Sequence, residues 1–162
     1  MGSLPLAFTS ELFARMRQLS EATYPYEGCG VLVGRVTEAA AVVTEVVAGH
    51  NLVTDRRHDR YELDPRDIIA AEKLARDRKE EVLGFFHTHP DHPARPSQFD
   101  TDRAWPGYHY VVVAVHSGRQ VAATCWRLQD GVEPNQFQEE DLQVLGGAAP
   151  GYNPPGPAAE EM

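Results

Sequence analysis

The fold is decided by residues 81–100, EVLGFFHTHPDHPARPSQFD, where an apolar segment runs into a histidine-rich one. The apolar residues 81–88 predict a buried β-strand. Residues 89–96 contain three prolines and predict a loop, because proline removes a backbone donor and restricts the chain. Ser97 is the expected cap of a short helix that reaches about Ala104. This order favours a metal site over an ordinary solvated loop.

His87 and His89 lie two residues apart at the end of that strand. Side chains at positions i and i+2 leave a strand on the same face, so both imidazoles can converge on one point. Zinc requires such nitrogens at about 2.0–2.1 Å in a tetrahedral array. A catalytic zinc takes three protein ligands and keeps its fourth position for water, whose pKa it lowers to about 7. The pair therefore predicts two zinc ligands, and a third must come from elsewhere.

One candidate pattern for the remaining ligands is HTHPDH, which matches the signature of metallo-β-lactamase-like hydrolases. In that pattern Asp91 and His92 would bind metal. That fold needs a longer chain with further ligands downstream, and only 70 residues follow His92. The later histidines, His109 and His116, lie in one predicted hairpin strand with no partner pattern. We therefore treat this pattern as the less favoured alternative.

The second pattern is His-x-His-Pro, six residues, then Ser-x-x-Asp, and the chain matches every fixed position. This motif resembles that of the JAMM (JAB/MPN+) zinc metallopeptidase family. The resemblance implies one Zn²⁺ per chain, with His87, His89 and Asp100 as metal ligands. It also implies that Ser97 helps to hold the oxyanion. Ser-x-x-acid is equally a helix capping box, and the two interpretations are compatible because a capped helix is a firm base for a ligand.

A hydrolytic zinc site also needs a group that takes a proton from water and gives it to the leaving amine. The resemblance places a glutamate just before the first core strand, which is Glu27 in the segment YPYEGCGVLVG, residues 24–34. Glu27 lies between a proline and a buried strand, where an idle charge is usually avoided. The alternative is a solvent-facing acid at a helix–strand joint. Gly28 and Gly30 are expected to let the backbone pass close to the metal.

The remaining pattern predicts a mixed α/β (α+β) fold with a single mixed β-sheet flanked by helices. The resemblance covers residues from about 5 to 130 and implies a JAB/MPN-like (cytidine-deaminase-like) fold. We expect one metallopeptidase domain at 1–145 and a disordered Gly/Ala/Pro-rich tail at 146–162. A possible short strand covers residues 61–63. The expected helices span 9–23, 66–79 and 97–104, and the expected strands span 29–36, 40–49, 81–88, 108–116 and 120–128.

Composition excludes several classes of protein. The net charge of −9 argues against a nucleic-acid partner, because phosphate binding needs a basic surface. Neither a signal peptide nor an apolar stretch long enough to span a membrane is evident, and we expect a cytoplasmic protein. The two cysteines are too few for a disulfide framework, and Cys29 is expected to pack in the core. The loop that contains Arg56, Arg57 and Arg60 either binds a carboxylate tail or, as we favour, is an ordinary solvated loop.

The family resemblance implies an enzyme of the small bacterial stand-alone type. Such relatives trim residues after the Gly-Gly end of ubiquitin-like sulfur carriers, whereas others remove ubiquitin-like modifiers from lysine. Only nine residues separate Asp100 from Tyr110, which leaves little room for the long insertion of polyubiquitin-specific relatives. We expect hydrolysis after the C-terminal Gly-Gly of a ubiquitin-like or sulfur-carrier protein, with deconjugation from lysine as the alternative. A non-catalytic scaffold is less favoured, because scaffold relatives lose the histidines or the aspartate. The sequence leaves the oligomeric state open.

Overall fold

A computed structural model describes residues 4–146 of the 162-residue chain, and these residues form one eight-stranded sheet with three helices. The strand order is β7-β6-β5-β4-β2-β3-β1-β8. The strands are β1 (Leu6–Thr9), β2 (Cys29–Val36), β3 (Ala41–Ala48), β4 (Glu81–Pro90), β5 (His109–His116), β6 (Arg119–Leu128), β7 (Phe137–Glu140) and β8 (Leu142–Leu145). The helices are α1 (Ser10–Ala22), α2 (Pro65–Asp77) and α3 (Gln98–Arg103).

The sheet is mixed, as the sequence predicts. Strand β4 pairs parallel with β5, and β1 pairs parallel with β3 and β8, whereas the remaining neighbours are antiparallel. Strand β4 lies near the middle of the sheet, between β2 and β5. It is therefore buried along most of its length. In residues 4–146, no helix is long and apolar enough to cross a membrane.

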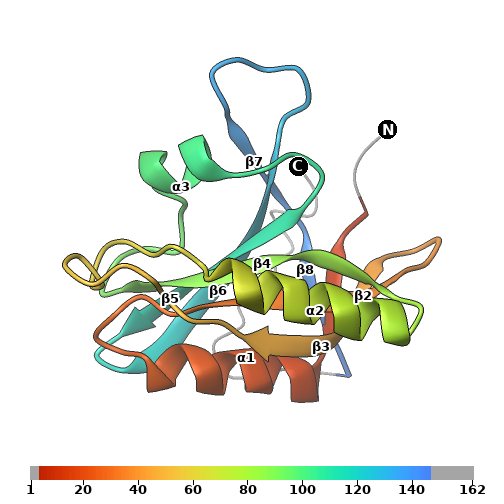
Figure 1. The fold of residues 1–162 in the computed structure, drawn as a ribbon, viewed down its shortest axis with the longest axis horizontal. Helices are drawn as coiled ribbons and strands as arrows, with labels where there is room; N and C mark the ends of the chain where they lie inside the picture. Colours follow the sequence, from red (N-terminus) through yellow and green to blue (C-terminus); the bar gives the residue numbers. More distant parts are fainter. Residues whose placement is uncertain (1–3, 147–162) are drawn as a thin grey trace, which may run out of the picture.

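Helices α1 and α2 cover opposite faces of the sheet (Figure 1). The α1 face holds the larger apolar cluster, in which Phe13 and Met16 of α1 pack with Leu32 of β2. The α2 face holds a second cluster, in which Ala71 and Ala75 of α2 contact inward-facing strand residues. Because successive strand residues point to opposite faces, each central strand contributes to both clusters.

The helix starts follow from local sequence. Thr9 caps α1 by accepting a hydrogen bond from the Leu12 N–H, and Asp64 caps α2 in the same way, directly before a proline at the first helical position. Ser97 caps α3 through a complete capping box with Asp100. The short helix expected after residue 96 is therefore confirmed.

Three expectations about local structure need correction. Strand β4 runs on to Pro90, so His89 lies in a strand and not in the loop predicted from the prolines. The possible strand at 61–63 is only an isolated bridge between Leu63 and Asn51. Strands β1, β7 and β8 are additional, because four-residue segments carry too little alternation to be recognised. The predicted disordered tail falls, from residue 147 onward, outside the described residues.

Candidate metal centre and active site

The centre of the site is the end of β4, where His87 and His89 point to the face of the sheet that α2 covers. Phe85, two residues before His87, belongs to the cluster packed under α2. Both histidines are buried, at 1% and 8% exposed. Their side chains share a face because both lie in a regular strand that pairs with β5 through Pro90. Two imidazoles thus converge beneath the loop that follows the strand.

Asp100 reaches these histidines from α3. Its Oδ2 atom lies 3.0 Å from Nε2 of His87 and 3.0 Å from Nε2 of His89. The same oxygen accepts a hydrogen bond of 2.8 Å from the Ser97 N–H. Burial acts to raise the pKa of Asp100, but the His87 charge and the hydrogen bonds from both histidines and Ser97 outweigh it, so the pKa lies well below its ordinary range. Asp100 is therefore an anion held between two imidazoles.

The two imidazoles are oriented by different neighbours. Nδ1 of His89 lies 3.0 Å from the Pro93 carbonyl oxygen, which can only accept, so Nδ1 carries a ring proton and Nε2 is the nitrogen directed at Asp100. The ring of Tyr61 stacks on His87 with centroids 4.5 Å apart and planes inclined by 18°. Nδ1 of His87 is buried and has no hydrogen-bond partner among the described residues. No pattern in the sequence singled out Tyr61 as a site residue, because it is a lone aromatic next to a polar loop.

Glu27 enters the site from the loop before β2. Its neighbour Gly28 is fixed to β4 by two hydrogen bonds with Thr88, one to the Thr88 hydroxyl and one from the Thr88 N–H. The Asn51 side-chain amide donates to the Glu27 carbonyl oxygen at 3.2 Å. These contacts place the side chain inside the protein, where it is 5% exposed. Glu27 is thus not the solvent-facing acid of the alternative interpretation.

The Glu27 carboxylate faces the histidines without a bonded partner. Its Oε1 atom is buried and accepts no hydrogen bond from the described residues. One ligand atom from each of Glu27, His87 and His89 lies within 4.8 Å of the other two. Burial first, and then the negative charges of Asp100 and Asp59, raise the pKa of Glu27 from 4.5 to about 9. An unpartnered acid beside two imidazoles is suited to exchanging a proton with a group that the chain does not itself supply.

The donor set suits a divalent ion. Asp100 lies 3.0 Å from both imidazoles, and Glu27 also has a ligand atom within 4.8 Å of theirs. Two nitrogens and a carboxylate oxygen this close are at the spacing of ligands that share one ion, and this donor combination is typical of zinc. Asp100 therefore fits as the third ligand, and Glu27 fits beside the ion. The unpartnered atoms of His87 and Glu27 support this fit.

Ser97 occupies the edge of the site. Its hydroxyl oxygen accepts a hydrogen bond of 3.0 Å from the Asp100 N–H, which completes the capping box. A hydroxyl that accepts in this way still has its proton to donate. The side chain is exposed, so the proton is available to a group that approaches from solvent. Capping and donation are thus compatible at Ser97.

Comparison with known proteins places the chain in a family. The family described as prokaryotic homologs of the JAB domain matches residues 9–129. The chain belongs to this family. Over 125 residues it is 31% identical to the desampylase of Haloferax volcanii, covering 74% of the chain and 84% of that protein. The region that the family matches, residues 9–129, contains every residue of the site described above.

Solved structures resemble this chain in fold. A protein of Desulfitobacterium hafniense superposes with a TM-score of 0.73 at 26% identity, over 86% of this chain and 92% of the other. A protein of Salinibacter ruber gives a TM-score of 0.66 at 36% identity, over 89% and 94%. A JAB1/MPN domain protein of Archaeoglobus fulgidus gives 0.52 at 17% identity, over 90% and 100%, which shows the shared fold alone.

The metallo-β-lactamase-like alternative disagrees with both the prokaryotic JAB fold and the local geometry. The Asp91 carboxylate accepts hydrogen bonds from the Tyr24 hydroxyl at 2.6 Å and from the Ser117 N–H at 2.9 Å. These bonds tie the loop after β4 to the β5–β6 turn. Asp91 therefore has a structural role.

Packing explains why glycine stands at positions 28 and 30 and why Cys29 is buried. A Cβ atom at Gly30 would lie 2.3 Å from the Phe86 ring and 2.5 Å from the Val47 carbonyl oxygen, so this glycine serves sheet packing and not approach to a metal. A Cβ atom at Gly28 would clash with the Thr23 side chain. Cys29 is buried, and burial first raises the pKa of its thiol to about 12, as expected for a core residue and not for a nucleophile.

The arginine loop lies against the rim of the site. Arg56 pairs with Asp59, Arg57 lies 4.3 Å over the ring of Tyr26, and Arg60 lies 4.4 Å over the ring of Phe99. All three guanidinium groups thus have a partner within the chain. This arrangement fits the favoured interpretation of an ordinary loop better than a grip for a carboxylate tail.

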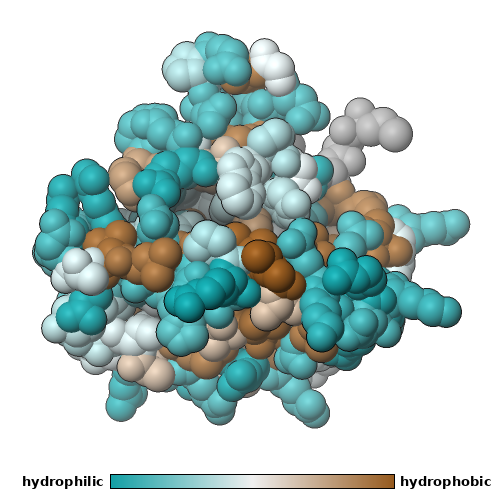
Figure 2. All heavy atoms as spheres, viewed as in Figure 1, coloured by the Kyte–Doolittle hydropathy of each residue, from teal (hydrophilic) through white to brown (hydrophobic). Residues whose placement is uncertain are grey.

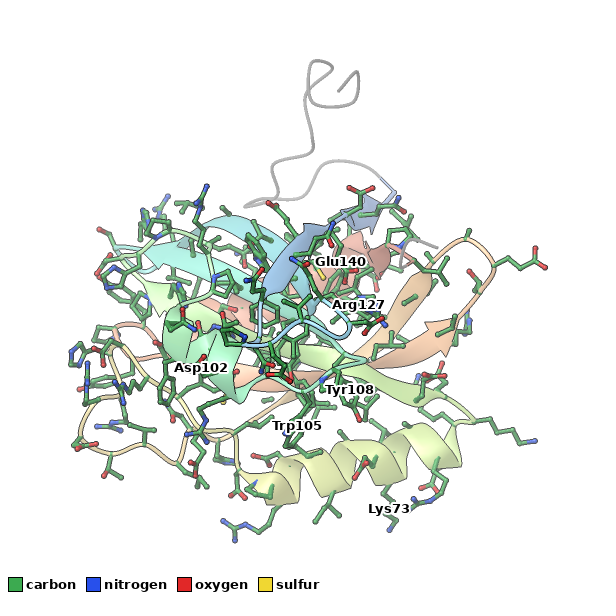
Figure 3. The ribbon with its side chains drawn as sticks, turned by 90° about the horizontal axis from the view of Figure 1, so that it is seen from above. Lys73, Asp102, Trp105, Tyr108, Arg127 and Glu140 are labelled. Carbon is green, nitrogen blue, oxygen red and sulfur yellow. The ribbon has the colours of Figure 1, made fainter. Side chains whose placement is uncertain are left out.

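An apolar cavity of about 260 Å³ adjoins the ligand Asp100 on the α2 side of the sheet. Trp105 and Tyr108, which follow α3, lie on this side (Figure 3). Figure 2, which has the same view as Figure 1, shows a mainly hydrophilic surface with apolar residues over α2. The cavity can take an apolar side chain next to the metal centre. Its lining includes Tyr61, Leu63, Ile68, Phe85, Phe99 and Trp105.

Proposed function

We propose that the chain is a zinc-dependent isopeptidase that cleaves the amide bond after the C-terminal Gly-Gly of a ubiquitin-like protein. The observation that carries this proposal is the convergence of Asp100 on His87 and His89, with the unpartnered acid Glu27 beside them. The desampylase relative supports a ubiquitin-like modifier as the substrate class and an isopeptide bond as the linkage. The alternative linkage is a peptide bond to residues that extend a sulfur carrier.

Each site residue has a distinct task in this proposal. His87, His89 and Asp100 hold the ion. When bound, zinc supplies Lewis-acid polarisation of the scissile carbonyl and lowers the pKa of water. Glu27 accepts a proton from water and delivers it to the leaving nitrogen, which must be protonated to depart as an amine. The Ser97 hydroxyl donates a hydrogen bond to the carbonyl oxygen as negative charge develops there.

The cavity beside Asp100 supports a polypeptide substrate. Its aromatic and aliphatic lining offers an apolar residue of the modifier a place to bind. A Gly-Gly end has no side chains, so it can enter the buried site where larger residues would clash. Binding energy from the apolar residue would hold the scissile bond in place.

The proposal is tested with zinc-loaded protein and two substrates built on one ubiquitin-like protein. In the first, its Gly-Gly end is joined to a lysine side chain, and in the second it is extended by a short linear peptide. Mass spectrometry is expected to show cleavage of the isopeptide, and Glu27→Gln should abolish it while retaining zinc. Glu11→Gln, an exposed acid on α1, is the matched control.

The two linkages give separate outcomes. Cleavage of the linear extension alone would replace deconjugation by trimming of a carrier. Cleavage at the wild-type rate by Glu27→Gln would contradict the proposed proton transfer. If the zinc-loaded protein cleaves neither substrate, the proposed hydrolysis is wrong.

A further inference from the structure

A second group of potential ligands lies on the opposite face of the sheet from the proposed active site. His109 of β5, Cys125 of β6 and Glu140 of β7 meet across three adjacent strands. Cys125 belongs to the cluster under α1, and His109 shares a face with Val111 of the same cluster. Figure 3 shows Glu140 far from α2, the helix that covers the active site. Nothing in the proposed hydrolysis uses these three side chains.

The three side chains converge on one oxygen atom. Oε1 of Glu140 makes a short contact with Nδ1 of His109 and accepts a hydrogen bond of 3.3 Å from the Cys125 thiol. One ligand atom from each residue lies within 4.8 Å of the other two. Tetrahedral zinc with bonds of about 2.0–2.3 Å holds neighbouring ligand atoms about 3.3–3.6 Å apart. The group therefore approaches the spacing that one ion requires, although the short contact between His109 and Glu140 must open to admit the ion.

The surroundings make a purely packing role costly. Cys125 is fully buried, and the His109 and Glu140 side chains are 7% and 8% exposed. Apolar residues of the cluster under α1 pack on this face, so a carboxylate buried here loses hydration that its partners must replace. Arg127, two residues after Cys125, is close enough to interact electrostatically with the thiol. At Asp100, likewise, two histidines contact one carboxylate oxygen. In both groups the side chains face one common point, as the ligands of a single ion do.

A catalytic cysteine is a poorer explanation. The thiol has no exposed surface, so no substrate can reach it. The histidine nitrogen nearest to it is engaged by Glu140 and not by the thiol. A thiolate nucleophile needs an accessible, electropositive setting, and this one is neither.

We propose that His109, Cys125 and Glu140 form a second zinc site. The ligands are Nδ1 of His109, the Cys125 thiolate and the Glu140 carboxylate, with water in the fourth position. On binding, the thiol proton passes to solvent, because only the thiolate ligates. The sheet separates this site from the proposed active site, and the two share no ligand.

Such a site would fasten an edge strand that influences the active site. Strand β7 is four residues long and pairs only with β6 in the described sheet. In the loop before it, the Asn135 side-chain amide donates to the Thr101 carbonyl oxygen of α3 at 3.2 Å. Helix α3 carries Asp100. Anchoring β7 to β5 and β6 therefore steadies the helix that supplies a ligand to the other centre.

The test uses Co²⁺ added to the metal-free full-length protein. Cobalt bound to a thiolate gives an intense near-ultraviolet charge-transfer band, which imidazole and carboxylate ligands alone do not give. We expect this band in the wild type and in His87→Ala. Cys125→Ser should lose it. Cys29→Ser is the matched control, because it removes the other buried cysteine and should leave the band intact.

Metal content separates the two centres. After zinc loading, elemental analysis should give two ions per wild-type chain, one per chain in Cys125→Ser and one in His87→Ala. If Cys125→Ser does not fold, Glu140→Gln and X-ray absorption of the zinc-loaded wild type decide, the latter through a sulfur neighbour at about 2.3 Å. One ion per wild-type chain, with no thiolate band and no sulfur neighbour, would overturn the second site and leave the proposed hydrolysis untouched.

Discussion

Oδ2 of Asp100 lies 3.0 Å from Nε2 of His87, although one residue lies in the first turn of a helix and the other near the end of a strand. The capping box of α3 fixes this relation, since the Ser97 N–H binds the same Oδ2 atom. The helix cap therefore sets the position of the carboxylate that would hold the ion. A site prepared in this way loses less conformational entropy when the ligand arrives.

Asp100→Asn should weaken zinc binding by more than about 100-fold. Loss of a residue that merely supports a ligand already costs about 10–100-fold, and here a direct charged ligand is replaced by a neutral amide. Competition with a chromophoric chelator measures the dissociation constant. Asp91→Ala is the control, because Asp91 bonds to Tyr24 and Ser117 instead. The reverse pattern, with Asp91→Ala losing zinc, would restore the metallo-β-lactamase-like alternative.

The sequence predicted most of the fold because the central elements have strong patterns. The valine-rich strands and the capped helices were placed within a few residues of their actual bounds. Strand β7, with the sequence FQEE, was not predicted, because a short polar edge strand has no apolar alternation. Whether such a segment forms a strand depends on its pairing with β6, which is a long-range contact.

The candidate site was only partly predictable for the same reason. His87, His89 and Asp100 lie within one short motif, so spacing alone identifies them. Tyr61 reaches His87 from a polar loop, and its position depends on how that loop crosses the sheet. The His109 group is less predictable still, because its members are about fifteen residues apart and meet only through the strand register.

Glu27→Gln should stabilise the metal-free protein at alkaline pH. The folded-state pKa of Glu27 is about 9, against 4.5 for the free side chain, so between these values the unfolded chain is ionised while the folded chain keeps its proton. Wild-type stability therefore falls as pH rises through this window, and glutamine, which mimics the neutral acid, removes the fall. At pH 8 we expect a gain of more than about 1 kcal/mol, since each pKa unit corresponds to about 1.4 kcal/mol.

Urea unfolding at pH 5 and pH 8 checks this difference in free energy. The gain should be small at pH 5 and should shrink at pH 8 when zinc is added, because a nearby cation favours the ionised acid. Glu11→Gln, on the exposed surface of α1, should show no such dependence. Equal stability of wild type and Glu27→Gln at both pH values would show that Glu27 is not a buried neutral acid.

Tyr61→Leu should weaken zinc binding by about 10-fold, because the stacked ring holds the His87 imidazole in the orientation that faces Asp100. Tyr61→Phe keeps the ring and should bind zinc as the wild type does. The same chelator competition measures both variants. A loss in Tyr61→Phe as large as in Tyr61→Leu would assign the effect to the hydroxyl and not to stacking.

Ile68→Arg should raise the KM for a ubiquitin-like substrate and leave kcat nearly unchanged. Ile68 lines the cavity beside Asp100, so a long charged side chain there would occupy the space in which the apolar residue of the substrate binds. The neighbouring Ile69 is 64% exposed and does not line the cavity, which makes Ile69→Arg the matched control on the same helix. Loss of one buried apolar contact corresponds to about 10-fold or more in KM. Steady-state kinetics on the isopeptide substrate separates the two constants, and an equal effect of both substitutions would show that charge on α2, and not the cavity, governs binding.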